Sequence, residues 1–459
     1  MLVLANRVSF GDFRRFVPCD VLRSLVLAEV TSDCGSGFGK HQPLRRCIMT
    51  DFETLRAWLR ANTRGMVELQ ALLTSIPAIA PESGGEGEAK KCDALQSWLI
   101  GHGFEAAHCA RYDAPDSRVP GGVRPNMVVT VPGMRDDVAI WVMAHLDVVP
   151  VGESALWKSD PWQVIEQDGK LIGRGVEDNQ QGLVSGVFAA LACLANGIRP
   201  AYTVRLLFMA DEEVGSEYGI KFLLREHAAL FGKDDLILIP DGGDPKGETI
   251  EIAEKNMLWL RLHTKGAQCH GSQPDNGKNA CLAACDLALR LHALEGVFNT
   301  HDDLFSPDYS TFQPTKREAN VQTVNIIPGD DVFYMDMRIL PRYTLDEVRA
   351  AVANQVAAVE AQYGVQVTVS ELHAEQSPAT AADAPVVTML ATAIKQAHGR
   401  SARTVGIGGG TVGAALRSAG YQCAIWSTID GTCHQPNEYC YVQNIVADAE
   451  TFAALFTQA

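Results

Sequence analysis

The chain has 459 residues, of which 47% are hydrophobic and 20% charged, a composition typical of a soluble globular protein with two or three domains. Its formal net charge of −16 and its pI near 5.2 argue against nucleic acid or an anionic membrane as the main partner, because both attract basic surfaces. No apolar run reaches the ~18 residues of a membrane span, and the twelve cysteines contain no Cys-x-x-Cys pair, which indicates a reduced, cytoplasmic protein.

The first 48 residues differ from the rest, with seven Lys and Arg against four Asp and Glu. They lack the long apolar core of a signal peptide. A helical pattern begins at Met49 with the capping box Thr50-x-x-Glu53. We therefore expect residues 1–48 to be an over-extended start or a disordered extension, with a basic transit peptide as the alternative. Mass spectrometry of the native protein tests this, because peptides from before Met49 would rule out the over-extended start.

Beyond this point apolar strands alternate with helical segments, which predicts an α/β sheet. A helix with a terminal glycine is predicted at 180–197. Four predicted strands run into polar residues: 138–144 into His-Leu-Asp, 202–210 into Asp-Glu-Glu, 235–240 into Asp-Gly-Gly-Asp, and 423–428 into Asp-Gly-Thr-Cys-His. Open α/β sheets bind ligands beyond the carboxyl ends of their strands. The four polar ends therefore predict one shared site.

The middle of the chain predicts a second unit of the α+β class. Its pattern is strand, helix, strand, helix, strand, at 256–272, 280–295, 332–339, 345–364 and 365–372. Because strand-end chemistry returns after it, we interpret this unit as an insertion. The expected domains are then a catalytic domain of 49–255 and 374–459, and an inserted domain of 256–373.

The polar strand ends and the turn before the 180–197 helix supply five candidate metal ligands. Each has an ordinary alternative when taken alone: a satisfied loop histidine, a helix cap, a solvated acidic turn or a plain turn residue. Asp147 stands two residues after a candidate histidine on a strand, so both side chains face one way and Asp147 could accept its N–H. The candidates are His145, Asp178, Glu213, Asp241 and His434.

Together these residues predict a metal centre. Two imidazoles and three carboxylates suit Zn²⁺, with Co²⁺ or Mn²⁺ as alternatives. Five ligands are too many for one catalytic zinc with an open position, but they suit two ions if one carboxylate bridges. Two cations would offset the repulsion within Asp211-Glu212-Glu213 and leave one glutamate free as a general base. Such ions, roughly 3.5–4 Å apart, would activate water and polarise a carbonyl.

With these motifs the sequence resembles the di-zinc amidohydrolases and exopeptidases that include aminoacylase, carnosinase, carboxypeptidase G, acetylornithine deacetylase and succinyl-diaminopimelate desuccinylase. The resemblance covers about 49–459 in the family's order. It implies a zinc-peptidase-like mixed sheet with helices on both faces, two Zn²⁺ per subunit, and an inserted lid that also forms a homodimer interface. The matching stretches are MAHLDVVP, GRGVEDNQQG, FMADEEVGS, HGSQPDNGKNA, NIIPGDDVFYMDMRILP, GIGGGT and CHQPNE.

The resemblance also implies roles for single residues. One metal would bind His145, Asp178 and Asp241, and the other Asp178, Glu213 and His434, so that Asp178 bridges. Glu212 would be the general base, which takes a proton from water and passes it to the leaving amine. Asp147 would orient His145.

Further roles fall in the inserted unit and a glycine-rich loop. His270 resembles the lid histidine that stabilises the oxyanion, often from the partner subunit. Asn325 and Arg338 resemble substrate contacts, and Arg338 could pair with a substrate carboxylate through two hydrogen bonds. The loop of Gly409, Gly410 and Thr411 would receive that carboxylate through backbone N–H groups. The residues alone leave alternatives open: Arg338 as a strand salt bridge, His270 as a turn residue, and the loop as a flexible turn.

The sequence departs from the family after the bridging position. Many relatives have Asp-x-Lys-Gly there, whereas this chain has Asp178-Asn-Gln-Gln-Gly182, without the lysine and with one extra residue. We predict a hydrolase that cleaves an amide bond next to a free carboxylate in small peptides. The alternative is an N-acyl-amino-acid deacylase, and Asp241 favours the peptidase because the deacylase branch usually has Glu. An inactive ligand-binding relative should lack a ligand or the base, and neither is missing.

Overall fold

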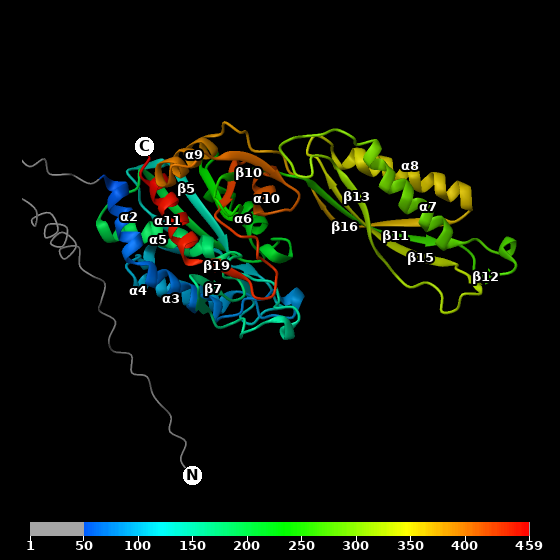
Figure 1. The fold of residues 1–459 in the computed structure, drawn as a ribbon, viewed down its shortest axis with the longest axis horizontal. Coiled ribbons are helices and arrows are strands. Elements are labelled where there is room, and N and C mark those ends of the chain that lie inside the picture. The colour runs from blue at the N-terminus through cyan, green and yellow to red at the C-terminus, as the bar shows by residue number, and fades with distance from the viewer. Residues whose placement is uncertain (1–49, 459) are drawn as a thin grey trace, which may run out of the picture. The chain divides into compact units, whose positions relative to one another are not determined.

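A computed structural model of the protein describes residues 50–458. The prediction for residues 1–48 lies outside this range. An eight-stranded mixed sheet is built from strands that come from the first and last parts of the described residues (Figure 1). In sheet order its strands are β1 (Cys109–Arg111), β4 (Met127–Val131), β8 (Tyr202–Met209), β5 (Arg135–His145), β9 (Leu236–Gly243), β18 (Cys423–Ser427), β10 (Thr249–Glu254) and β17 (Arg403–Ile407).

The central strands of this sheet run parallel. β8, β5, β9 and β18 pair in parallel with one another in that order, whereas β1 and β4 are antiparallel additions at one side. The carboxyl ends of the four parallel strands therefore meet at the same edge of the sheet. These are the four strands whose polar ends were noticed in the sequence.

Helices cover both faces of the sheet, because the central strands are apolar on both sides. On β5, Ile140 and Val142 point into one hydrophobic core, and Trp141 and Met143 into another. The first core is closed by α2 (Asp51–Ala61), α3 (Thr63–Thr74), α4 (Ala89–Gly101), α5 (Gln180–Asn196), α9 (Pro385–His398) and α11 (Val442–Phe456), the second by α6 (Ile220–Glu226) and α10 (Val412–Ser418). The predicted mixed α/β fold is confirmed, and the predicted glycine stop is Gly197, with φ of 63°.

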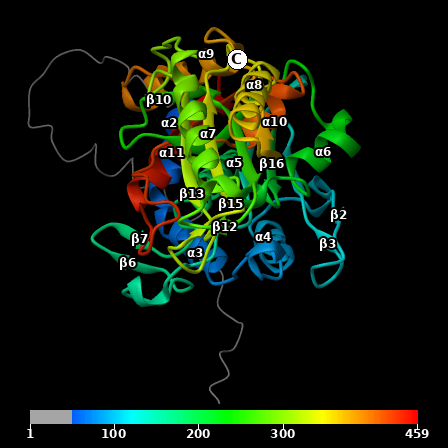
Figure 2. The same ribbon diagram turned by 90° about the vertical axis from the view of Figure 1, so that its right-hand side faces the viewer.

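A separate antiparallel sheet comes from the middle of the chain. Its strands, in sheet order, are β13 (Thr311–Arg317), β15 (Asp330–Ile339), β11 (Asn256–Lys265) and β16 (Gln366–Glu375). Leu258, Leu260 and Leu262 alternate into a core closed by α7 (Ala280–His292) and α8 (Leu345–Tyr363), which lie side by side in Figure 2. Sequence patterns predicted each of these elements except β13, where Pro314 and an exposed edge obscure the strand pattern. The domain boundaries at 256 and 373 stay a prediction.

Short elements connect these parts. The short strands are β2 (Ala114–Pro115), β3 (Val123–Arg124), β6 (Ile165–Gln167), β7 (Lys170–Ile172), β12 (Cys269–His270), β14 (Ile326–Ile327) and β19 (Tyr439–Tyr441). The 3₁₀ turns are η1 (Pro81–Ser83), η2 (Ala106–His108), η3 (Ser154–Leu156), η4 (Glu212–Val214), η5 (Ala228–Leu230), η6 (Pro274–Asn276) and η7 (Ala293–Gly296). Within residues 50–458, none of the helices is long and apolar enough to cross a membrane.

Glu251 on β10 generates a stability prediction. It is 5% exposed, and its Oε2 lacks a hydrogen-bond partner in the described structure. Burial, together with the neighbouring Glu254 and Asp241, raises the pKa of Glu251 from 4.5 to about 8. A carboxyl group whose pKa is raised by folding favours the folded state below pH 4.5, and this contribution is lost as the pH rises through about 8.

We therefore expect Glu251→Gln, which keeps the volume but cannot ionise, to stabilise the protein at alkaline pH. The free energy of unfolding of the metal-free protein should rise by roughly 2–4 kcal/mol at pH 9 and change little at pH 5. Urea unfolding with a chelator present measures both, with Glu68→Gln on the exposed face of α3 as the control. An equal effect at the two pH values would contradict the prediction.

Candidate metal centre

The predicted ligands come together at the edge where the parallel strands end. β5 ends on His145, β8 ends just before the acidic turn of η4, and β9 carries Asp241. Asp178 stands two residues before α5, and His434 lies in the loop that follows β18. The chain folds this way because β5 pairs in parallel with both β8 and β9, and β18 pairs in parallel with β9.

Asp178 lies between the two histidines of the cluster. His145 Nε2 is 3.0 Å from Asp178 Oδ1 and 3.8 Å from Asp241 Oδ1. His434 Nε2 is 3.0 Å from Asp178 Oδ2 and 3.0 Å from Glu213 Oε2. The two oxygens of Asp178 thus face different imidazoles, which is the arrangement that a bridging carboxylate requires.

The donor atoms are close enough for a divalent cation. The described structure contains two groups of three residues whose ligand atoms all lie within 4.8 Å of one another inside the group. One group is His145, Glu212 and Asp241, and the other is His145, Asp178 and Glu213. Nitrogen and carboxylate oxygen are donors that Zn²⁺, Co²⁺ and Mn²⁺ accept. Because Glu212 belongs to one of these groups, distance alone does not decide which of Glu212 and Glu213 is the metal ligand and which is the general base. Glu213 is the more constrained glutamate, since its Oε1 also accepts the Val149 N–H at 3.2 Å.

Burial dominates the electrostatics of the carboxylates. It raises the pKa of Glu212 well above its usual value, and the nearby Asp241 and Glu213 raise it further. Burial likewise raises the pKa of Glu213 and of Asp241. Without a cation these three carboxylates therefore hold their protons more tightly than free carboxylates do, and divalent cations could offset the burial and the repulsion. The chemistry of the donor set thus fits a metal ion.

The same acids raise the pKa values of the two histidines and so favour their charged form. Hydrogen bonds to Asp178 and Glu213 raise the pKa of His434 to about 10. Burial opposes the charging of His145, but its hydrogen bonds to Asp147 and Asp178 raise its pKa well above the usual value. Burial alone would raise the pKa of Asp178, but the hydrogen bonds and positive charges of the two histidines lower it. A metal ion would have to displace protons from both imidazoles, since only the neutral ring binds a metal.

Asp147 supports the site differently from the prediction. Its Oδ1 and Oδ2 accept the backbone N–H groups of Glu212 and Glu213, each at 3.1 Å. His145 Nδ1 lies 2.9 Å from the Asp147 carbonyl oxygen but 3.4 Å from the carboxylate. The main-chain oxygen is thus the closer partner of the imidazole, because the carboxylate is engaged by the acidic turn.

Arg124 is a supporting residue that sequence reasoning missed. It is fully buried, and its Nη2 lies 3.1 Å from Asp211 Oδ1. Asp211 adopts a left-handed conformation with φ of 71° and accepts the Tyr218 N–H at 3.0 Å. A non-glycine residue at this φ must be held by its surroundings. Arg124 and Tyr218 therefore fix the start of the turn that presents Glu212 and Glu213.

Asn179 is a second missed residue. Its side-chain amide donates to Asp241 Oδ1 at 2.8 Å and to the Pro240 carbonyl at 2.6 Å. These bonds fix one oxygen of Asp241. The sequence carried no signal for them, because an asparagine before a helix is most simply a cap.

The predicted residues of the inserted unit are not part of this cluster. In residues 50–458 no hydrogen bond or ion pair joins His270, Asn325 or Arg338 to the five candidate ligands. His270 and Asn325 are exposed, on and beside the β12–β14 pair. His270 Nδ1 lies 2.8 Å from Ser272 Oγ, and Asn325 accepts the Thr323 hydroxyl at 2.8 Å.

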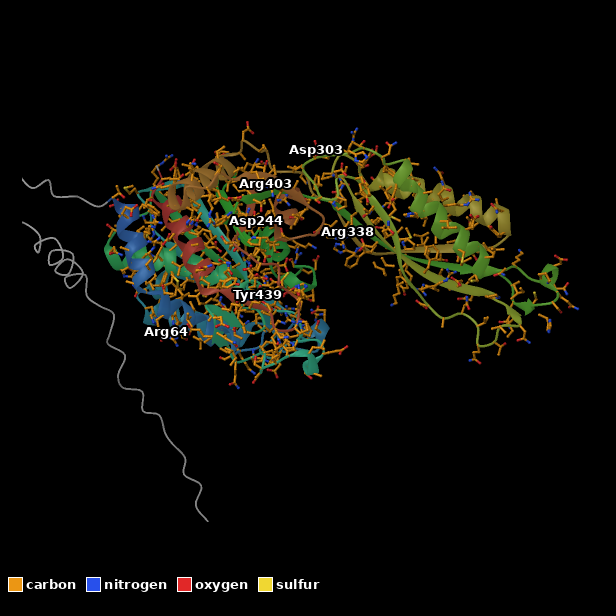
Figure 3. The ribbon with its side chains drawn as sticks, viewed as in Figure 1. Arg64, Asp244, Asp303, Arg338, Arg403 and Tyr439 are labelled. Atoms are coloured by element: carbon orange, nitrogen blue, oxygen red, sulfur yellow. The ribbon has the colours of Figure 1, made fainter. Side chains whose placement is uncertain are left out.

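Arg338, labelled in Figure 3, forms the strand salt bridge that the sequence left open. Its Nε and Nη2 lie 2.7 and 3.1 Å from the two oxygens of Asp336, so the edge suited to a substrate carboxylate is occupied. Its Nη1 donates to the Gly408 carbonyl at 2.9 Å, which joins it to the glycine loop. Thr411 in that loop caps α10 and donates to Glu254 Oε1 at 2.8 Å.

A mixed α/β sheet with imidazoles and carboxylates gathered at its strand ends defines a metallohydrolase. The chain belongs to Peptidase family M20/M25/M40, whose model matches residues 141–458. This finding confirms the family resemblance and assigns the chain to the metallohydrolases of that family.

The relatives cover between 67% and 86% of this chain. An uncharacterized metallohydrolase of Methanocaldococcus jannaschii is 37% identical over 400 residues, 84% of this chain and 97% of the relative. A succinyl-diaminopimelate desuccinylase of Pseudomonas syringae is 26% identical over 309 residues, 67% of this chain and 78% of the relative. The solved aminopeptidase PepT of Bacillus cereus superimposes with a TM-score of 0.69 at 18% identity, over 86% of this chain and 98% of that one, which shows the shared fold.

The position of Asp178 generates a prediction about metal content. Because its two oxygens face the two halves of the cluster, Asp178→Asn should lose both metal equivalents, whereas His434→Ala should lose one. Elemental analysis after incubation with cobalt and dialysis measures this, with His301→Ala on the exposed surface as the control. Two retained equivalents in either variant would contradict the arrangement.

Proposed function

We propose that this metallohydrolase is a di-zinc peptidase that cleaves the amide bond next to a free carboxylate in small peptides, as a dipeptidase or exopeptidase does. The observation that carries the proposal is the position of Asp178, with one oxygen 3.0 Å from each of two imidazoles and Glu212 close by. A paired site of this kind serves hydrolysis better than structural binding, because structural zinc sites are usually closed by four ligands.

In this proposal the side chains form two sets of metal ligands, and one further residue is the general base. His145, Asp178 and Asp241 would hold one zinc ion, and Asp178, Glu213 and His434 the other. The two ions, when bound, would activate water and polarise the carbonyl of the substrate amide. Glu212 would accept the proton of the attacking water and deliver it to the leaving amine. In the metal-free cluster its burial and its acidic neighbours raise its pKa.

Recognition of the substrate carboxylate is proposed for the loop at 408–411. The Gly409 and Gly410 N–H groups are available there, whereas Thr411 N–H is directed at Glu254 Oε2, 3.3 Å away. Arg338 would contribute through the loop, since its Nη1 contacts the Gly408 carbonyl. A direct pair with the substrate would require Arg338 to leave Asp336.

His270 and Asn325 would act from a second subunit. Because neither contacts the ligand cluster within one described chain, their role as oxyanion and substrate contacts rests on the homodimer that the family resemblance implies. We also propose a cytoplasmic location, in keeping with the cysteines of residues 50–458, which are all free.

A deacylase for N-acyl amino acids is the second candidate. The similarity to succinyl-diaminopimelate desuccinylase favours it, whereas Asp241, in place of the glutamate usual in that branch, favours the peptidase. A panel of dipeptides against acetyl and succinyl amino acids, each with zinc, cobalt or manganese, separates the two. We expect dipeptides to be cleaved with the higher kcat/KM. Faster cleavage of acyl amino acids would reverse the assignment, and no hydrolysis together with no metal uptake would favour an inactive binding protein.

Glu212→Gln is the test of the base. An amide cannot take up the proton of water, so kcat should fall by at least ~10³-fold, within the range of general base catalysis. Metal content should stay at the wild-type value, since Glu212 is proposed to hold no ion. Elemental analysis and initial rates on the best dipeptide measure the two quantities. A variant that remains fully active, or one that loses metal, would refute the role.

A further inference from the structure

Two buried glutamates that the proposed reaction does not use connect the loops of Asp178 and His434. Glu177 precedes Asp178 in the chain, and Glu438 follows His434 by four residues. They are 4% and 1% exposed. Each carboxylate is directed at the backbone of the other loop, so each loop is held by a side chain of its neighbour.

Glu438 closes the turn that presents Asp178. Its Oε2 accepts the Gly175 N–H at 3.0 Å, and its Oε1 accepts the N–H groups of Glu177 and Asp178 at 3.0 and 3.1 Å. Arg174 Nη1 lies 2.7 Å from the same carboxylate and neutralises it. Three backbone donors from residues 175–178 and one cation thus surround one buried carboxylate, which is a geometry that orders a loop.

Glu177 makes the reverse contacts with the loop of His434. Its Oε1 accepts the Asp430 N–H at 2.7 Å. Its Oε2 accepts from the Thr432 N–H and from Thr432 Oγ1, the hydroxyl at 2.8 Å. His434, two residues further on, has φ of 61°, a conformation that a non-glycine residue holds only when its surroundings impose it.

We propose that Glu177 and Glu438 are positioning residues, and that their reciprocal clamp sets the separation of Asp178 and His434 for the second metal ion. This inference rests on the proposed two-metal function. The ion between Asp178, Glu213 and His434 draws ligands from both clamped loops. The other ion would share Asp178 but would take its remaining ligands, His145 and Asp241, from strands β5 and β9, which the sheet fixes. Loss of the clamp should therefore affect one ion much more than the other.

Glu177→Gln and Glu438→Gln test the clamp with almost no change of volume. Both oxygens of each carboxylate face N–H donors, so an amide must direct its NH₂ group at a donor in either orientation. Cobalt titration of the protein, monitored by calorimetry and by visible absorbance, should show two equivalents of bound cobalt for the wild type. Each variant should keep the first equivalent and bind the second 10–100-fold more weakly, roughly the usual effect of removing an outer partner of a metal site. High cobalt should restore the wild-type spectrum.

Hydrogen exchange of the metal-free protein gives an independent readout. Glu438→Gln should accelerate exchange in the peptide that contains Gly175 to Asp178, and Glu177→Gln in the peptide that contains Asp430 to Thr432. Glu153→Gln, the same chemical change at an exposed position, should alter neither. If either glutamine variant does not fold, Thr432→Val removes the hydroxyl that contacts Glu177 and that also contacts the Tyr439 N–H and carbonyl. It should weaken the second equivalent in the same direction.

The possible results distinguish a failure of the clamp proposal from a failure of the two-metal function on which it rests. Variants that bind both equivalents with wild-type affinity and unchanged exchange would overturn the clamp, as would equal weakening of the two equivalents. Wild-type protein that binds fewer than two equivalents would instead overturn the two-metal function. Selective weakening of one equivalent, with faster exchange in the opposite loop, would establish the positioning role.

Discussion

The site depends on the electrostatic cost of gathering four buried or half-buried acids at one edge of a sheet. Like charges at such separations resist joint ionisation, and burial strengthens the repulsion. The cations of the chain do not relieve it: in the described structure no Lys or Arg forms an ion pair with Asp178, Glu212, Glu213 or Asp241. Among residues 50–458, His145 and His434 are the groups of opposite charge in direct contact with these acids, and a histidine can exchange its proton for a metal ion.

The buried arginines and one buried lysine lie a layer further out. Arg174 pairs with Glu438, and Arg124 pairs with Glu88 and Asp211. Lys91, 1% exposed, has its pKa lowered to about 8 by burial, against the attraction of nearby acids. These cations balance the acids that support the ligands and leave the ligands themselves uncompensated. The acids around the candidate ligands therefore have cationic partners, whereas the ligand carboxylates have no Lys or Arg partner in the described structure. This distribution of charge attracts divalent ions.

The sequence allowed prediction of the strands and of the residues at their ends, because strand periodicity and the order of the motifs are local signals. It did not allow prediction of Arg124, Asn179 or Glu177, since their partners lie 36 to 255 residues away in the chain. Asp147 was recognised, but its carboxylate serves the acidic turn, and only three-dimensional packing decides between two nearby partners. β13 was missed for a local reason, the proline within it.

The extra residue after Asp178 has a structural explanation. Gln180 accepts the Thr74 hydroxyl at 2.9 Å, and Gln181 donates to Asp448 and to the Thr428 carbonyl at 2.8 and 2.7 Å. The two amides thus attach the first turn of α5 to α3, to α11 and to the end of β18. A lysine would bring a charge into this buried segment, with a desolvation cost that a neutral amide avoids.

The place of β18 in the large sheet has a consequence for how the protein is made. This strand lies between β9 and β10, although about 170 residues separate it from them in the chain. Until the ribosome has released the last part of the chain, β9 and β10 expose unpaired strand edges, and the loop of His434 does not exist. Synthesis thus completes the sheet and brings the loop of His434 to Asp178 and Glu213 in one late event.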